Sequence, residues 1–380
     1  GAGNHTDTLK SIARMIINRI SLFSISLDYK ILSRARAQVK TMALPGTVVA
    51  IHSDSGLTGY GEAIPLAPSY LPMLPEGTRG GIARLAPELL GRNPLGISAL
   101  YDLMELKLRG FADAKSALDL ALWDLLGKHT DLPMHTLLGG RQSESAILYN
   151  SIPHDSPEVM VESICEQRAA GIRRFQIKVG ADPDADIERL HRVYEALKPG
   201  ERAFADANRG WLPEDALRVL NGIKGLDLVI EQPCDGYEAC LQIRRQTSHP
   251  IMLDEIIDGP RDLMRAINDR ALDIVVLKIT HMGGLTPSLL MARMCLQAGI
   301  RMRIEDTVGC ELSNAAVAHL GTALPAQHIY ACYQAPDYGV TLGPSAASIK
   351  NGDVFPGDTP GLGVDVDPAL LGEPVAEWVL

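Results

Sequence analysis

Short apolar stretches that end on a charged residue recur along the second half of the chain. Six of them (FQIK, AFAD, LVIE, IMLD, VVLK and MRIE) end on Lys178, Asp206, Glu231, Asp254, Lys278 and Glu305, which lie 28, 25, 23, 24 and 27 residues apart. Each stretch is rich in β-branched or aliphatic residues, and each is followed by a segment with helical periodicity. A strand, a helix and two loops take about 25 residues, so the pattern predicts a repeated βα unit.

The same spacing extends the repeat in both directions. Counting back 28 residues from Lys178 reaches Asn150 in AILYNSI, and IYACY at 329–333 follows Glu305 at a similar distance. Eight such units close a barrel of parallel strands, and the C-terminal ends of the strands build its active site. The charged strand ends are therefore expected at one common mouth.

The first part of the chain has a different pattern. From Met15 it reads as strands with a tight turn at 54–56, followed by helices over 78–90, 97–108 and 112–128. The polar stretch at 30–45 has no apolar periodicity and is expected to be a mobile loop. Residues 343–380 are rich in Pro and Gly, too irregular for more barrel, and are expected to return to the first domain.

These patterns predict an α/β fold class. We expect a modified (β/α)8 TIM-type barrel at 141–342 with an α+β capping domain formed by N- and C-terminal segments. The capping segments are 15–140 and 343–380, and residues 1–14 are interpreted as a tag or a disordered extension.

Composition narrows the class of protein. The 380 residues, 46% of them hydrophobic, can bury cores for two domains, and the net charge of −10 argues against a nucleic-acid partner. No apolar stretch reaches the ~18 residues of a membrane span. The six cysteines form no CxxC pair, as in reduced proteins. We expect a cytoplasmic homo-oligomeric enzyme that binds neither nucleic acid nor membrane.

Three consecutive strands end on carboxylates, at Asp206, Glu231 and Asp254. A solvated strand end is an equally good interpretation of any one of them. Three carboxylates in one mouth, however, repel one another unless a cation neutralises them. Hard oxygen ligands without nearby Cys or His favour one Mg²⁺ per active site.

Taken in order, the motifs GLTGYGEA, SALDLALWDLLGK, QIK, DAN, IEQP, LDE, LKITHMGG and IEDTVG resemble the enolase superfamily, in its muconate lactonizing enzyme subgroup. The resemblance implies that Asp206, Glu231 and Asp254 bind the Mg²⁺. It also implies that Lys178 and Lys278 flank the substrate α-carbon from opposite faces, one as base and one as acid. Removing a proton α to a carboxylate gives an enediolate, whose second negative charge a divalent cation stabilises. Desolvation and nearby positive charge are expected to lower the pKa of a lysine there.

Two departures from related patterns matter. The muconate-type strand-two motif is Lys-x-Lys, but here Gln176 holds the first position, so the cation beside Lys178 is missing. Gln176 is instead expected to donate hydrogen bonds to the substrate carboxylate. Strand seven ends in IED at 304–306 without a His, which excludes the His/Asp pair of the mandelate racemase subgroup. Glu255, next to Asp254, is expected to lie outside the direct metal ligands and to help orient them.

Within the subgroup, QIK, IEQPC, the segment PSYLPMLPEGTRGGIARLAPELLG and IEDTVG most resemble enzymes that act on proline derivatives. These are cis-3-hydroxy-L-proline dehydratases and hydroxyproline betaine 2-epimerases. The expected substrate is thus a small-molecule carboxylate of the proline type. SYLP and IED favour dehydration, the reaction of a carbon–oxygen hydro-lyase, and racemisation or epimerisation by an isomerase is the alternative.

A cyclic amino acid also needs a partner for its ammonium group. Asp306, with Tyr330 or Tyr333, is expected to provide it through charge and cation–π contact. Asn208 and Tyr70 are further substrate-binding candidates, and core packing is the plain alternative for the tyrosines. A catalytically dead metal-binding scaffold is disfavoured, because both lysines and all three carboxylates are present.

Overall fold

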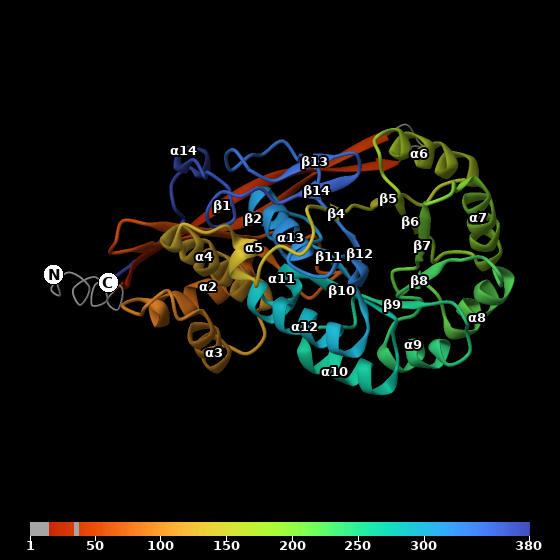
Figure 1. Ribbon diagram of the computed structural model, residues 1–380, viewed down its shortest axis with the longest axis horizontal. Coiled ribbons are helices and arrows are strands. Elements are labelled where there is room, and N and C mark those ends of the chain that lie inside the picture. The colour runs from red at the N-terminus through yellow and green to blue at the C-terminus, as the bar shows by residue number, and fades with distance from the viewer. Residues whose placement is uncertain (1–14, 34–37) are drawn as a thin grey trace.

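The computed structural model describes residues 15–33 and 38–380, with side chains described over 15–29 and 42–380. The predicted extension at 1–14 lies outside these residues. Figure 1 shows an elongated molecule with a ring of strands and helices at one end and a capping domain at the other. All six cysteines are free, and only Cys165 among them is exposed. None of the described helices has the length and apolar character needed to cross a membrane.

The ring is a barrel of eight parallel strands. Their order in the sheet is β12-β11-β10-β9-β8-β7-β6-β5. The strands are β5 (Asn150–Ile152), β6 (Arg174–Lys178), β7 (Arg202–Asp206), β8 (Val229–Glu231), β9 (Ile251–Leu253), β10 (Ile274–Lys278), β11 (Arg301–Glu305) and β12 (Ile329–Cys332). The ring closes where Leu148 bridges Cys332 and where the Tyr149 amide donates to the Cys332 carbonyl at 3.0 Å. The predicted barrel is confirmed.

Helices connect successive strands and cover the outside of the ring (Figure 1). They are α6 (Pro157–Ala169), α7 (Pro183–Ala196), α8 (Pro213–Gly222), α9 (Tyr237–Arg244), α10 (Pro260–Asp269), α11 (Ile279–Met282), α12 (Leu285–Ala298) and α13 (Glu311–Thr322). After β12, which follows the short helix η2 (Ala326–His328), the chain leaves the barrel. There β13 (Ser348–Lys350) and β14 (Asp353–Phe355) complete a three-stranded sheet with β4 (Ala146–Ile147), which precedes β5 in the chain.

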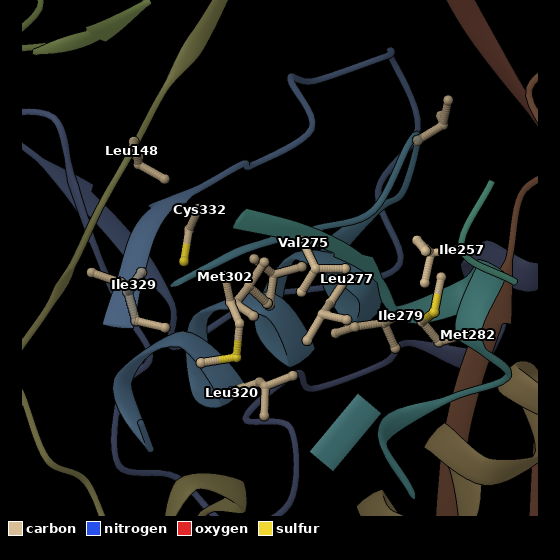
Figure 2. Packing of buried hydrophobic residues seen from close by; sticks show 14 of the residues in the cluster. Leu148, Ile257, Val275, Leu277, Ile279, Met282, Met302, Leu320, Ile329 and Cys332 are labelled. Carbon is tan, nitrogen blue, oxygen red and sulfur yellow. The ribbon is translucent and has the colours of Figure 1, made fainter. Parts of the chain in front are cut away.

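Strand alternation sorts the barrel residues into two sets. Val275 and Leu277 of β10 and Met302 of β11 are fully buried and belong, with Leu320 of α13, to the hydrophobic cluster between the strands and the surrounding helices (Figure 2). Because successive side chains of a strand point to opposite faces, the residues between them point into the barrel. This alternation directs Lys278, at the end of β10, toward the interior.

The capping domain is built on a four-stranded sheet of order β15-β1-β2-β3. It contains β1 (Ile17–Ser33), β2 (Gln38–Ser53), β3 (Thr58–Ala63), β15 (Ala376–Val379) and the helices α2 (Pro75–Leu89), α3 (Ile97–Lys107) and α4 (Ala112–Thr130), with the short helices α5 (Met134–Leu137) and α14 (Pro368–Leu371) nearby in the chain. The C-terminal strand β15 pairs with β1, as in the partners Arg19 and Val379.

The loop predicted at 30–45 is wrong. Strands β1 and β2 continue through most of this stretch as an antiparallel ribbon, with Lys30 opposite Thr41 and Ser33 opposite Gln38. A two-stranded ribbon satisfies its backbone by pairing and needs no continuous buried face, so apolar periodicity does not reveal it. The ribbon runs past the barrel toward α6 (Figure 1).

Two glycines allow helix α4 to lie directly on strand β3. A Cβ atom at Gly59 would come within 2.0 Å of the Ala121 carbonyl oxygen, and one at Gly61 within 2.0 Å of the Ala117 carbonyl oxygen. This close approach explains the small residues in GLTGYGEA. It also places Glu62, the next residue, at the junction between cap and barrel.

Two buried carboxylates of the cap hold the N-termini of barrel helices. Glu62 accepts hydrogen bonds from the backbone amides of Cys310 and Ser313 at 2.8 Å each, where α13 begins. Asp119 accepts from the Thr286 amide at 2.9 Å, where α12 begins. Burial raises the pKa of both carboxyl groups to about 7, although the hydrogen bonds oppose the shift.

Glu62→Gln should therefore reduce the pH dependence of stability. A carboxyl group whose pKa is raised on folding stabilises the protein at low pH, and this contribution is lost as pH rises through the folded pKa. The variant should remove on the order of 2 kcal/mol of the decrease in unfolding free energy between pH 5 and pH 8. Urea unfolding at the two pH values measures this. Glu144→Gln, at an exposed position, is the control, and equal decreases in both variants would contradict the prediction.

Candidate active site

The predicted strand-end residues meet at one end of the barrel. Lys178, Asp206 and Glu231 are direct partners across β6, β7 and β8. Lys278 and Glu305 are partners across β10 and β11. Because partners in a parallel sheet share one face, these side chains form a layer at the C-terminal ends of the strands. Asp254 follows β9 directly, and its amide donates to the Gln232 side-chain oxygen at 3.0 Å.

A second, largely apolar layer lies beneath the charged one. Its cluster contains Tyr149, Phe204, Val229, Met252, Ile274, Val276, Tyr330 and Ala331, with Tyr333 packed against them. This layer excludes water from the barrel interior below the mouth. The charges above it are therefore held in a region of low polarity, where they interact strongly.

The three predicted metal ligands are buried and paired with cations. Asp206, Glu231 and Asp254 are each at most 2% exposed. Lys178 Nζ lies 2.5 Å from Asp206 Oδ2, and Lys278 Nζ donates to Asp254 Oδ1. Each carboxylate of the trio thus has a side-chain cation beside it, since Glu231 pairs with a guanidinium described below.

Burial and like charge act on these carboxylates together. Burial, with the charges of Asp206 and Asp254, raises the pKa of Glu231 to about 8 against the opposing effect of Arg303. For Asp254 burial acts upward, but Lys278 and Arg303 outweigh it and lower the pKa to about 2. The trio carries more negative charge than an apolar interior accepts without cations.

The donor chemistry of the trio fits Mg²⁺, although its arrangement here does not form a closed set of ligands. Within residues 15–33 and 38–380 no group of three or more His, Cys, Asp or Glu side chains converges as a metal site. Lysine nitrogens contact Asp206 and Asp254 at oxygens that a cation would use, and the Arg303 guanidinium pairs with Glu231. A divalent cation carries the same kind of charge to the same oxygens, so it would replace the lysine ammonium groups there.

The expected lowering of the lysine pKa values is not found in this structure. Burial does oppose the charged form of Lys178, but Asp206 and Glu231 outweigh it and raise its pKa. Burial is likewise outweighed at Lys278, mainly by Asp254, and its pKa lies well above the usual value. Direct ion pairs with carboxylates decide the direction in both cases.

Gln176 donates from its amide nitrogen to two of the carboxylates. The distances are 3.0 Å to Asp206 Oδ2 and 3.0 Å to Glu231 Oε2. Gln176 also lines the cavity at the mouth. Its predicted contact with a substrate carboxylate stays a prediction, but its donor is already used by the carboxylate trio.

Asn208 connects the lysine on β6 with the predicted supporting residue Glu255. Its side-chain oxygen accepts from Lys178 Nζ at 2.8 Å, and its side-chain nitrogen donates to Glu255 Oε1 at 2.9 Å. Asn208 has φ of 42°, in the left-handed region that Asn tolerates, and its amide donates to Asp206 Oδ1. This turn places Asn208 between Lys178 and Glu255, in hydrogen-bond contact with both. Burial, together with the charge of Asp254, raises the pKa of Glu255 to about 7.

The loop between β3 and α2 brings Tyr70 into the mouth. The Tyr70 hydroxyl donates to Asp254 Oδ2 at 3.2 Å, and its ring centroid is 5.4 Å from Lys278 Nζ. The neighbouring residue Ser69 accepts from Arg209 of the barrel at 3.1 Å through its carbonyl. The cap therefore covers one side of the mouth through contacts with the charged layer.

Tyr333 and Asp306 also line the mouth. The Tyr333 ring lies 5.4 Å from that of Tyr149. Asp306 accepts from the Thr280 hydroxyl at 2.6 Å and from its amide at 3.1 Å. Burial raises the pKa of Asp306 to about 7 despite these hydrogen bonds. The other tyrosine considered, Tyr330, belongs to the apolar layer below.

Together these side chains surround a cavity of about 450 Å³. Its lining includes Tyr29, Tyr70, Tyr149, Gln176, Lys178, Asn208, Lys278, Arg303, Glu305, Asp306 and Tyr333. The three buried carboxylates are not part of this lining, because the lysines, Gln176 and Arg303 contact them from the cavity side. The cavity suits a small polar molecule with both a ring and charged groups.

Three residues of this site were missed in the sequence. Tyr29 lies in β1, in the stretch predicted as a strand just before the predicted loop, and no local signal places it at the barrel. Tyr149 immediately precedes Asn150, so strand alternation points it inward while Asn150 donates to Gln167 of α6. Arg303 stands two residues before Glu305 in MRIE, and the same alternation would have assigned it to the interior.

Most of the chain matches known protein families. Residues 31–139 match the family model "Mandelate racemase / muconate lactonizing enzyme, N-terminal domain", and residues 159–370 match "Enolase C-terminal domain-like". A cis-3-hydroxy-L-proline dehydratase of Roseibium aggregatum is 43% identical over 87% of this chain and 91% of that protein. A hydrophobic dipeptide epimerase of Enterococcus faecalis is 30% identical over 73% and 78%.

A solved structure shows the same architecture. An enolase superfamily member from Roseovarius nubinhibens, complexed with magnesium, superposes with a TM-score of 0.91 at 34% identity. The match covers 96% of this chain and 100% of that one.

Proposed function

This chain belongs to the mandelate racemase/muconate lactonizing enzyme family of the enolase superfamily, and we propose that it is a Mg²⁺-dependent dehydratase of cis-3-hydroxy-L-proline or a closely similar proline derivative. One observation carries the proposal. Lys178 of β6 and Lys278 of β10 line one cavity, and three strands separate them in the sheet order. Two proton-transfer groups on different sides of one cavity suit a reaction that begins with loss of an α-proton.

Asp206, Glu231 and Asp254 would hold one Mg²⁺. Their hard oxygen donors, their burial and their mutual repulsion support this role. The solved relative that was complexed with magnesium supports it independently. When bound, the ion would stabilise the negative charge that develops on the substrate carboxylate.

The side chains of this chain would then divide the proton transfers. One lysine takes the α-proton, and the electron pair left on the α-carbon forms a double bond to the β-carbon as the 3-hydroxyl leaves. The departing hydroxyl receives a proton from the other lysine or from the same one and is released as water. Asn208 orients Lys178 in this scheme through its 2.8 Å hydrogen bond.

A proline-type substrate fits the remaining walls. Tyr29, Tyr70 and Tyr333 offer aromatic faces to a cationic ring, and Asp306 offers a carboxylate to its ammonium group. The name and 43% identity of the dehydratase relative favour the same substrate class. The cavity of about 450 Å³ is ample for a five-membered ring with its carboxylate.

Racemisation or 2-epimerisation is the second candidate. Several relatives of lower identity are named as epimerases or racemases. The same first step serves both outcomes, and reprotonation from the opposite lysine would invert the α-carbon instead of expelling the hydroxyl. A substrate without a 3-hydroxyl, such as proline betaine, leaves only this second outcome.

Proton NMR in D₂O separates the two candidates. With cis-3-hydroxy-L-proline and Mg²⁺, the dehydratase should release water and give an enamine that tautomerises to the ketimine, so the signal of the proton on the hydroxyl-bearing C3 should disappear. With proline betaine, a 2-epimerase should give the deuterated epimer. Conversion of the betaine together with no change in the hydroxyproline would refute the dehydratase proposal. Mg²⁺ binding without conversion of either compound would leave the metal-binding scaffold as the better description.

A further inference from the structure

Arg303 is a charged residue in the middle of a barrel strand. It is 1% exposed and lies among the largest fully buried side chains. The guanidinium carbon lies 4.9 Å from the centroid of the Tyr149 ring and 5.2 Å from that of Phe204. Burial of a cation costs desolvation free energy unless anionic partners compensate for it, so the partners of this guanidinium indicate its role.

The guanidinium forms a two-pronged pair with Glu231. Nη1 lies 2.5 Å from Oε2, and Nη2 lies 2.5 Å from Oε1. Such a pair fixes both the position and the plane of a carboxylate. Gln176 Nε2 donates to the same Oε2 at 3.0 Å. An ionised carboxylate oxygen has about two lone pairs, so Oε2 is fully used and Oε1 keeps one for another partner.

The third nitrogen of the guanidinium reaches the other side of the site. Nε lies 2.7 Å from Glu305 Oε2, to which the Tyr149 hydroxyl also donates at 2.5 Å. Glu305 Oε1 lies 3.2 Å from Lys278 Nζ. One side chain therefore links the central carboxylate of the trio to the carboxylate beside the lysine on β10.

We propose that Arg303 is the positioning residue that orients Glu231 for the metal, and that it supplies from β11 the cation that Lys-x-Lys proteins carry at the position of Gln176. A cation can reach Glu231 from either strand, because Gln176 Nε2 of β6 and Arg303 Nη1 of β11 contact the same oxygen atom, Glu231 Oε2. A lysine at position 176 would bring a cation to that oxygen from β6. The proposal rests on the proposed metal role of Glu231, and it does not depend on the identity of the substrate.

Mg²⁺ titration of the substrate-free enzyme by calorimetry tests this proposal. Arg303→Met should bind Mg²⁺ about 10- to 100-fold more weakly, as when a group that orients a metal ligand is lost. Arg303→Lys keeps the positive charge but cannot form the two-pronged pair with Glu231. Its Mg²⁺ affinity should therefore lie between those of the wild type and of Arg303→Met. The double variant Gln176→Lys/Arg303→Met should recover at least about tenfold relative to Arg303→Met. Arg301→Met, at the exposed start of the same strand, should bind as the wild type does.

Thermal unfolding of the metal-free proteins separates positioning from a merely structural role. A structural role alone would lower the melting temperature of Arg303→Met and leave the Mg²⁺ affinity of the folded protein unchanged, and that result would overturn the proposal. If the double variant binds Mg²⁺ no better than Arg303→Met does, the inference that Arg303 takes the place of a lysine at position 176 is overturned. If Arg303→Met does not fold, the double variant decides: wild-type-like folding with Mg²⁺ affinity within about tenfold of wild type supports the proposal, and failure of either overturns it.

Failure of the proposed function has a different signature. Wild-type protein that binds Mg²⁺ but converts no proline derivative would refute the substrate and leave this comparison intact. If titration of the wild-type protein shows no Mg²⁺ binding, the proposed metal role of the three carboxylates is refuted before any variant is compared.

Discussion

Alanine in place of Lys178 or of Lys278 is expected to lower kcat for dehydration by several powers of ten. A positioned proton-transfer group usually contributes about 10² to 10⁴ in rate, and here the transfer also starts the reaction. The two lysines are not equivalent in their surroundings, since the Lys178 side chain is 29% exposed and that of Lys278 is 1% exposed. Steady-state kinetics with Mg²⁺ at saturation measures both losses.

Exchange of the α-proton in D₂O separates the roles of the two lysines. With one stereoisomer as substrate, only the lysine on the side of the α-proton can remove it. The variant that lacks this lysine should lose exchange and turnover together. The variant that lacks the other lysine should still exchange the α-proton even when the overall reaction is lost. The assignment of base and acid follows directly from which variant keeps exchange.

A surface lysine provides the control for both variants. Lys224→Ala lies at an exposed position in the loop after α8 and should keep wild-type exchange and turnover. Full exchange and full turnover in both active-site variants would show that neither lysine transfers the proton. That result would remove the central observation behind the proposed function.

The positions of the charged strand ends were predictable because each follows the apolar run of a buried strand. Lys178, Asp206, Glu231, Lys278 and Glu305 each end a strand where the sequence indicated. A strand that is buried on both sides shows a run of apolar residues, and the first polar residue after it marks the open end of the barrel. The barrel then follows from the regular spacing of these marks.

The partners of these residues were harder to predict, because they come from distant parts of the chain. The sequence indicated that the cation beside Lys178 was missing, but not that Arg303 reaches Glu231 across the barrel at 2.5 Å. A charge inside an apolar run is easily taken for a residue on the solvent side of a strand. Only the closed ring shows that the inner face of β11 meets the end of β8.

The directions of the lysine pKa shifts also depended on such contacts. Desolvation alone would lower the pKa of Lys278, as the sequence suggested, but Asp254 and Glu305 lie directly beside it. Likewise, the ribbon formed by β1 and β2 could not be seen at 30–45, since pairing between its two strands, not a buried face, holds it together. Tyr29, in β1 just before this stretch, lines the cavity without any local sign in the sequence.

Loss of the proposed Mg²⁺ should have the second largest effect on activity. Asp206→Asn should bind Mg²⁺ at least about 100-fold more weakly, because one of the three proposed charged ligands is lost and Mg²⁺ demands near-octahedral oxygen geometry. The amide also turns one acceptor into a donor beside Lys178 and Gln176, which now donate to Asp206 Oδ2 at 2.5 Å and 3.0 Å. A loss of several kcal/mol in transition-state stabilisation corresponds to a decrease of about 10³-fold or more in kcat.

Calorimetric titration with Mg²⁺ and kinetics after dialysis against EDTA test this expectation together. Wild-type enzyme should lose activity in EDTA and regain it when Mg²⁺ is added, whereas Asp206→Asn should stay inactive at Mg²⁺ concentrations that restore the wild type. Asp227→Asn is a matched control, since Asp227 immediately precedes the segment that leads into β8 and its side chain is 69% exposed. Activity that survives exhaustive EDTA treatment would refute the metal assignment. The three buried carboxylates would then be neutralised by Lys178, Lys278 and Arg303 alone, and the site would have to act without a divalent cation.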